Sequence, residues 1–353
     1  MFDFPNAPIV GSTITAPNGT VFKWDGDKWI GASSTQAVAS PYGNVGRNLI
    51  HNGLFNVAQR GAGPFAAGGY TLDRWTAGLG AGDTQSISQA QLSDGERAVI
   101  GDEAARFALQ CVFTGAAGAS NYVYMQHKIE DIRRLAGKAV TLSFYANAGT
   151  ANIKLGINLG QIFGTGGAPS ATISTAPQVV TLSSSAGTWT RSTLTFAMPS
   201  SSGKTFGTNN DSFTALNIWY SAGSGMVGSA GAIGVQSGTI NIWGVQLEIG
   251  NVATPLEKPD PQVDLANCCR FYQVGVGRIA THVPAGGSGI GHSMLLPVRM
   301  RASPTMTSNF TTQTNCSSST VGAITDATVH AITIATAAGG LVAEGAFTAS
   351  ADL

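Results

Sequence analysis

The chain has 353 residues, a formal net charge of zero and only 11% charged residues, where about 25% is usual. A neutral chain exerts no long-range attraction on nucleic acid or on anionic membranes, so we expect neither as a partner. The hydrophobic content of 43% is too high for a disordered chain. With so little charge, solubility depends on hydroxyl and amide groups, and large uncharged surfaces suit an obligate oligomer.

The sequence shows no basic segment followed by an apolar run at its start, and no stretch approaches the roughly 18 apolar residues of a membrane span. We therefore expect folding in a cytoplasm and no membrane insertion. None of the four cysteines has zinc-ligand spacing with the five histidines. We expect all of them to be reduced, with no bound metal and no cofactor; they are Cys111, Cys268, Cys269 and Cys316.

Residues 1–32 have the pattern of a small β module, because apolar and polar residues alternate around turns at Asn18–Gly19 and Asp25–Asp27. A unit of this size buries too little surface to be strongly stable alone, so we expect it to dock on a partner. Its aromatic anchors are Phe4, Phe22, Trp24 and Trp29. Residues 33–47 are small, polar and contain proline and glycine, which is typical of a linker.

Residues 48–257 are predicted to form a two-sheet β-sandwich, since short alternating segments follow one another without the alternation of strands and helices of a parallel sheet. In the segment Ala139–Ala146, for example, Val140, Leu142 and Phe144 alternate with polar or amphipathic residues. The other predicted strands are Ala105–Phe113, Asn121–Ile129, Asn152–Asn158, Gln178–Leu182, Thr188–Met198, Phe213–Tyr220 and Thr239–Glu248. The clearest helical segment is Glu130–Ala136, ended by Gly137.

Residues 258–273 form a predicted helical connector, because apolar residues recur at three-to-four-residue spacing after Pro261, which is tolerated in a first helical turn. A separate small β domain is predicted for residues 274–353. Its strands are Val274–Ile279, Gly291–Val298 and Ala331–Thr336, while Thr305–Thr320 fits either a strand or a loop. The fold class is therefore all-β, with one or two short helices.

The search for catalytic motifs gives negative results. Gly291–Met294 begins like the nucleophile elbow of an esterase, but Leu295 stands where that motif needs glycine. The pairs Asp102–Glu103 and Glu130–Asp131 are the densest carboxylates, and a glycosidase needs two such groups facing each other. Since neighbouring residues on a strand point to opposite sides, we interpret these pairs as solvated and predict no catalytic residue.

A series of segments in fixed order carries a family resemblance: FPNAPIVGSTITAPNGTVFKWDGDKWI, NLIHNGLFNVAQRG, YTLDRW, IEDIRRLAGKAVTLSFYANAG and IWGVQLEIGNVATPLE. Together they resemble tail-fibre and adsorption proteins of tailed bacteriophages over roughly residues 1–273. The remainder resembles the same fibres more loosely, through LPVRMRASPTMT and FTASADL. The resemblance implies a jelly-roll domain similar to carbohydrate-binding modules, and an N-terminal module that attaches to other virion proteins through Phe4, Phe22, Trp24 and Trp29.

In the carbohydrate-binding modules that this domain resembles, sugars stack on exposed aromatic rings and are held by amide and carboxylate side chains. The resemblance therefore makes candidates of Tyr122, Tyr145, Trp219 and Tyr220, together with Tyr124; packing in a core or a trimer interface is the alternative for each. Those modules often carry a structural calcium ion. Here Trp243 and Gly244 stand where acids would be, and only Glu248 is left.

The motif YTLDRW also has a structural interpretation. Tyr70 and Trp75 would anchor the start of a strand, while Asp73 and Arg74 would form an ion pair at the sheet edge or pair across it.

We interpret the chain as a non-enzymatic protein of a phage virion, assembled as a homotrimer in the host cytoplasm. It would attach the particle to host surface polysaccharide or lipopolysaccharide. One alternative is a fibre or decoration protein with a purely structural role. Another is a polysaccharide depolymerase, although the sequence lacks the long parallel β-helix repeats of such enzymes.

Overall fold

The computed structural model describes residues 4–5, 9–16, 21–31, 46–66, 68–149, 152–182 and 188–353, without the side chains of residues 30 and 31. The chain forms two compact units, Met1–Arg47 and Asn48–Leu353. Both are built of antiparallel sheets, so the predicted all-β fold class is confirmed. In the described part of the chain, no helix has the length and apolar character needed to cross a membrane.

The first unit contains a three-stranded antiparallel meander of β1 (Thr13–Thr15), β2 (Val21–Trp24) and β3 (Trp29–Gly31). The turn between β2 and β3 is closed by the carboxylate of Asp25, which accepts hydrogen bonds from the backbone N–H groups of Asp27 and Lys28. The second predicted turn, at Asn18–Gly19, lies outside the described residues, as does most of the predicted linker.

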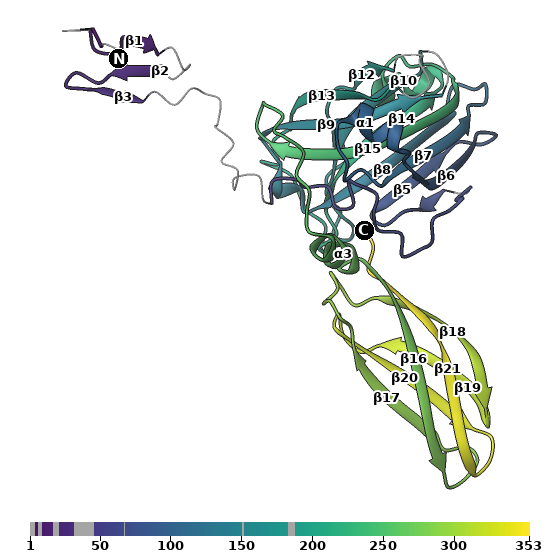
Figure 1. Ribbon diagram of the computed structural model, residues 1–353. Helices are drawn as coiled ribbons and strands as arrows, with labels where there is room; N and C mark the ends of the chain where they lie inside the picture. Colours follow the sequence, from purple (N-terminus) through teal and green to yellow (C-terminus); the bar gives the residue numbers. More distant parts are fainter. Residues whose placement is uncertain are drawn as a thin grey trace. The chain divides into compact units, whose positions relative to one another are not determined.

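The sandwich in the second unit consists of two facing antiparallel sheets (Figure 1). We call the seven-stranded one sheet I and the five-stranded one sheet II. Sheet I has the order β11-β10-β14-β8-β5-β4, with β12 also paired to β10. Its strands are β4 (Gly69–Tyr70), β5 (Trp75–Leu79), β8 (Tyr122–Glu130), β10 (Lys154–Ile162), β11 (Ile173–Ser174), β12 (Gln178–Thr181) and β14 (Phe213–Ala222).

Sheet II has the order β13-β9-β15-β7-β6. Its strands are β6 (Thr84–Gln91), β7 (Phe107–Thr114), β9 (Ala139–Ala148), β13 (Thr190–Ala197) and β15 (Ser237–Ile249). The apolar residues of each strand's alternating pattern point between the sheets; on β9, Leu142 and Phe144 are fully buried. The central core therefore lies between the two sheets, as the alternation predicts.

One predicted helix is wrong, and one helix of the structure was not predicted. The segment predicted as a helix over Glu130–Ala136 is only a 3-10 turn, η1 (Ile132–Arg134), because Glu130 still belongs to β8. A true helix, α1 (Asp94–Ile100), was missed. Ser93 and Glu96 form a capping box at its start, and Gly101 ends it with a φ of 76°.

The connector contains α3 (Pro261–Cys269), whose first turn is capped by the side chain of Asp260. Beyond it lie two three-stranded sheets, β16-β21-β18 and β17-β20-β19. The undecided segment Thr305–Thr320 is strand over most of its length. The strands are β16 (Tyr272–Val283), β17 (Gly289–Leu295), β18 (Thr305–Thr314), β19 (Cys316–Ala323), β20 (Thr328–Ala335) and β21 (Gly339–Ser350).

Asp73 and Arg74 of the YTLDRW motif do not pair with each other: both are buried, and the carboxylate of Asp73 lies 4.0 Å from the guanidinium of Arg60. The carboxylate of Asp73 accepts hydrogen bonds from the backbone and side chain of Gln59, at 2.6 and 2.7 Å. The guanidinium of Arg74 lies 3.3 Å from the ring centroid of Phe271, in the connector. The motif therefore fastens the connector to the sandwich.

Candidate functional site

The outer face of sheet I carries aromatic and amide side chains on its central strands. On β8, Val123 and Met125 point into the core, so the alternation turns Tyr122, Tyr124 and Gln126 outward. Trp219 of β14 lies opposite Tyr124 in the strand register. Two neighbouring strands thus place three aromatic rings side by side.

We call Tyr122, Tyr124 and Trp219 the aromatic platform. The ring centroids of Tyr124 and Trp219 are 4.7 Å apart, and those of the two tyrosines are 5.6 Å apart with a tilt of 32°. Both tyrosines are half-buried, whereas Trp219 is only 7% exposed and forms the base of the cluster. Burial raises the pKa of the Tyr124 hydroxyl, so this group stays protonated at neutral pH.

Glycines on both flanking strands leave room for the platform rings. In the register, Gly156 of β10 lies opposite Trp219, and Gly78 of β5 lies opposite Tyr124. A Cβ atom at Gly78 would be 2.5 Å from the Tyr124 ring. The ring of Tyr124 therefore leans across the backbone of β5, which a larger residue at position 78 would prevent.

A row of amide side chains lies beside the platform, one step along the same strands. Gln126 Nε2 donates to Asn217 Oδ1 at 2.7 Å, and Asn217 Nδ2 donates to Asn158 Oδ1 at 3.1 Å. The indole Nε1 of Trp219 donates to the same oxygen at 3.0 Å. This network holds the amides and the tryptophan in one arrangement, so the face is ordered before any ligand arrives.

One side of the platform is bounded by the segment that contains η2 (Ser224–Met226) and α2 (Val227–Ala230). Ala230 and Ile233 pack against Trp219, and Met226 contacts the same cluster. The carbonyl oxygen of Ala230 would be 1.8 Å from a Cβ atom at Gly156. This segment therefore covers the β10 side, while the tyrosines keep partly exposed surface.

The chemistry available at this face is apolar stacking together with hydrogen bonding by amides. Such a combination matches a sugar, whose C–H faces are apolar and whose edge carries hydroxyls. Among the described residues, no group of three histidine, cysteine or carboxylate side chains is placed to hold a metal ion. The oxygens of Glu248 accept hydrogen bonds from Gln246 and Thr254.

Two of the predicted glycan contacts lie elsewhere. Tyr220 is fully buried and packs 5.6 Å from Phe113, so its proposed exposure was wrong: on a strand it must face the opposite side from Trp219. Tyr145 lies on the outer face of sheet II, 5.5 Å from Trp243. There it is half-buried and packs against a satellite core that contains Trp243.

The aromatic anchors of the first unit contact one another. Phe4 packs edge-on against Phe22 at 5.0 Å and is stacked with Trp29 at 5.6 Å, while Trp24 lies 5.7 Å from Trp29. All four side chains are half-buried within their unit. Their role in attachment stays a prediction.

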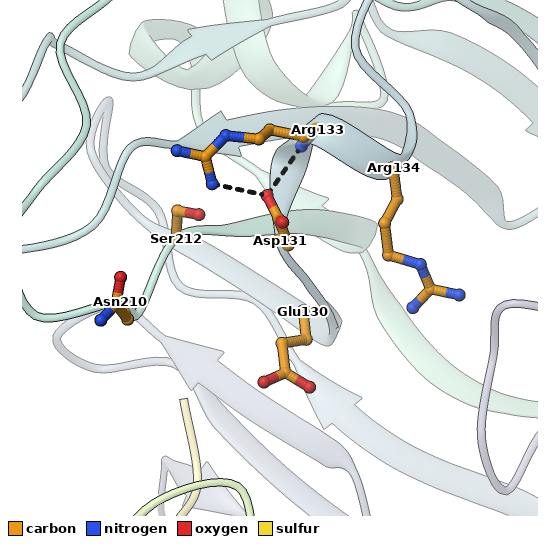
Figure 2. Close-up of a pocket in the computed structure, with 6 residues that line it drawn as sticks. All are labelled: Glu130, Asp131, Arg133, Arg134, Asn210 and Ser212. Atoms are coloured by element: carbon orange, nitrogen blue, oxygen red, sulfur yellow. Dashed lines mark hydrogen bonds and ion pairs between the residues drawn. The ribbon is translucent and has the colours of Figure 1, made fainter.

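The two carboxylate pairs are engaged by basic residues. Asp102 pairs with Lys258 at 2.7 Å, and Glu103 lies 3.7 Å from Arg97. Glu130 and Asp131 both line one cavity, and Figure 2 shows their carboxylates pointing in different directions, that of Asp131 toward Arg133. Asp131, with a φ of 60°, follows the last residue of β8.

No protein-family model matches the chain, and no curated protein matches it. Among solved structures, it is similar to a family 11 carbohydrate-binding module of Clostridium thermocellum, with 11% identity, a TM-score of 0.32, and coverage of 51% of this chain and 91% of that one. It is also similar to a CBM22 xylan-binding domain of Paenibacillus barcinonensis, with 11% identity and a TM-score of 0.31. That similarity covers 58% of this chain and 96% of the xylan-binding domain.

A third similar structure is the enzymatically active domain of tailspike protein 4 of bacteriophage CBA120, with 13% identity and a TM-score of 0.31. The similarity covers 57% of this chain but 21% of that one. With TM-scores below 0.5, these similarities carry no weight for what the chain binds.

Proposed function

We propose that the outer face of sheet I binds a glycan. The observation that carries this proposal is the aromatic platform, whose half-exposed tyrosine rings lie directly beside the hydrogen-bonded amide row. A sugar ring would stack on Tyr122 and Tyr124 while its hydroxyls meet Gln126 at the edge of the row. Since the side chains of the platform and the amide row carry no charge, binding should depend little on salt.

The class of glycan and the biological setting rest on the resemblance of the sequence to phage tail fibres. We propose that the chain is a non-enzymatic virion protein that attaches to host surface polysaccharide or lipopolysaccharide. Each site would bind weakly, and a homotrimer would strengthen attachment by presenting three sites at once. The first unit would connect the fibre to other virion proteins.

A glycan array probed with the purified full chain tests the platform. We expect binding to at least one bacterial surface glycan, and a loss of about fivefold in affinity for each of Tyr122→Ala and Tyr124→Ala, because stacking on an aromatic ring contributes on the order of 1 kcal/mol per ring. Tyr145→Ala is the matched control, since Tyr145 lies on the other sheet. Binding that survives both platform changes would refute the site.

A purely structural protein and a depolymerase, the two alternatives, would each give a different result. A chain that binds no glycan at all, yet assembles into particles, would have a purely structural role. Release of reducing sugar from host polysaccharide would establish a depolymerase instead.

A further inference from the structure

The polar cavity lined by Glu130 and Asp131 has a volume of about 330 Å³ and opens at the end of β8, away from the aromatic platform. Figure 2 shows its lining side chains around the η1 turn. They come from two segments that are distant in sequence: Glu130, Asp131, Arg133, Arg134, Asn210 and Ser212.

The two carboxylates of this cavity are already matched by arginines. The guanidinium of Arg270 approaches Glu130 at 3.0 Å, and that of Arg133 approaches Asp131 at 3.3 Å. Asp211, next to the lining, is engaged by the backbone and hydroxyl of Thr165.

The guanidinium of Arg134 is different. Within the described ranges it makes no ion pair and no hydrogen bond, although its backbone carbonyl accepts a bond from Lys138. Arg134 therefore supplies a positive charge that no carboxylate of the cavity neutralises.

The surroundings favour an anion further. Arg301 donates to the backbone carbonyl of Asn210 at 3.4 Å, so another guanidinium stands at the rim. Arg133 is held in place by the ring of Phe206, whose centroid lies 3.8 Å from its guanidinium carbon. Asn210 and Ser212 add hydrogen-bonding groups.

We propose that this cavity binds a small oxyanion, a carboxylate or a phosphate group, with the Arg134 guanidinium as its main donor. A guanidinium presents several N–H groups in a plane and can bind either group with two parallel hydrogen bonds. The proposal is independent of the aromatic platform, which lies farther along β8.

A second cavity of similar size provides the matched control. It has a volume of about 400 Å³ and is lined by Gln91, Arg97, Glu103, Arg106 and Phe107. There Arg97 lies near two carboxylates, those of Asp94 and Glu103. Arg106, like Arg134, makes no ion pair with a described residue, so Arg106→Gln removes an equivalent charge from a different cavity and controls for general electrostatic effects.

The experiment is a calorimetric titration of the full chain at low ionic strength with three probes: sodium glucuronate, inorganic phosphate and uncharged glucose. We expect weak binding of at least one anion, no binding of glucose at this site, and a rise in Kd of about fivefold in Arg134→Gln, the size of an exposed charged contact. Arg106→Gln and Tyr124→Ala should leave the Kd unchanged.

The two anions distinguish the chemical class of the ligand. Binding of glucuronate alone identifies a carboxylate ligand, such as an acidic sugar, and binding of phosphate alone identifies a phosphorylated one. The proposal fails if neither anion binds, if Arg134→Gln binds as well as the unaltered chain, or if Arg106→Gln weakens binding equally. Loss of anion binding in Tyr124→Ala would also overturn it, since the two sites would then not be separate.

Discussion

The outer faces of the two sheets are built from similar parts but differ in what covers them. Sheet I presents Tyr122, Tyr124 and Trp219 beside the amide row of Gln126, Asn217 and Asn158. Sheet II presents Tyr145 and Trp243, also beside an amide row, in which Gln110 donates to Asn241 and Asn241 to Asn147.

On sheet II the tryptophan is closed off, while Tyr145 is half-buried. Trp243 is only 1% exposed, because Leu54, Ile100 of α1 and Leu256 pack over it from three separate segments. On sheet I the segment of η2 and α2 packs over β10 and β14 and leaves Tyr122 and Tyr124 of β8 partly exposed. The same residue types therefore serve stability on one sheet and leave a surface for a ligand on the other, and the connecting segments decide which.

The largest effect that tests this comparison is expected from Trp243→Ala. Removing this buried ring should lower the free energy of unfolding by about 3 to 5 kcal/mol, because the satellite core around it cannot collapse fully. Tyr122→Ala should cost less than half as much, since its ring is already partly in water. Urea unfolding followed by circular dichroism measures both, and equal losses would contradict the difference between the faces.

Acid should affect both faces together, because they share one core. Burial, and then the charge of Arg74, lowers the pKa of His51 from 6.5 to about 3. The unfolded chain takes up this proton first, so stability is lost as the pH falls from about 6.5 towards 3. The loss at pH 5 should be roughly 2 kcal/mol for His51 alone.

His127 is also buried, and burial lowers its pKa, so it adds to the loss of folding stability in acid. Burial raises the pKa values of Asp73 and Asp264, which opposes the loss at lower pH. His51→Phe should reduce the difference between the urea midpoints at pH 7 and pH 5. An unchanged difference would show that His51 does not titrate on unfolding. Glycan binding should be lost in acid only where the chain unfolds.

A smaller effect tests whether the position of the Tyr124 ring matters, and not only its presence. Gly78→Ala leaves every aromatic residue in place but pushes against the Tyr124 ring, so we expect glycan affinity to fall by severalfold with little change in stability. Gly160→Ala is the control, because a Cβ atom there meets nothing closer than 3.4 Å. The measurement is glycan affinity alongside the melting temperature. Normal binding by Gly78→Ala would mean that the ring position is unimportant.

The smallest effect is expected for Tyr220→Phe. The hydroxyl of Tyr220 is buried and has no hydrogen-bond partner among the described residues, so its removal should leave stability unchanged or raise it by about 1 kcal/mol. Glycan binding should be unaffected. Thermal unfolding together with the glycan array checks both, and a loss of binding would restore Tyr220 to the site.

The sandwich could be predicted because alternation on strands such as β9 reports directly which side is buried. Alternation could also have separated Trp219 from Tyr220, since neighbours on a strand cannot share a face. The missed helix α1 had a readable signal too: Ser93 and Glu96 at capping-box spacing, with Gly101 at the end.

Other features could not be read from the chain alone. The cover over Trp243 comes from segments near residues 54, 100 and 256, and only their tertiary packing decides that they meet. The charged cavity joins residues 130–134 to residues 210–212, and it depends on the positive φ of Asp131. Both features are products of long-range contacts, which local patterns do not specify.

The way in which β16 and β21 leave the connector has a mechanical consequence. Their twelve cross-strand pairs run from Tyr272 and Ser350 to Val283 and Gly339, and the pair nearest the sandwich is closed by a hydrogen bond from Ala351 N to the carbonyl of Phe271. A force that drew these two ends apart would load the bonds one after another, as in a zipper, rather than all at once. Tension on Leu353 should therefore first break the contacts of Asp352 with Arg60 and of Leu353 with Tyr70 and Lys128, and then open the two strands from Tyr272 and Ser350.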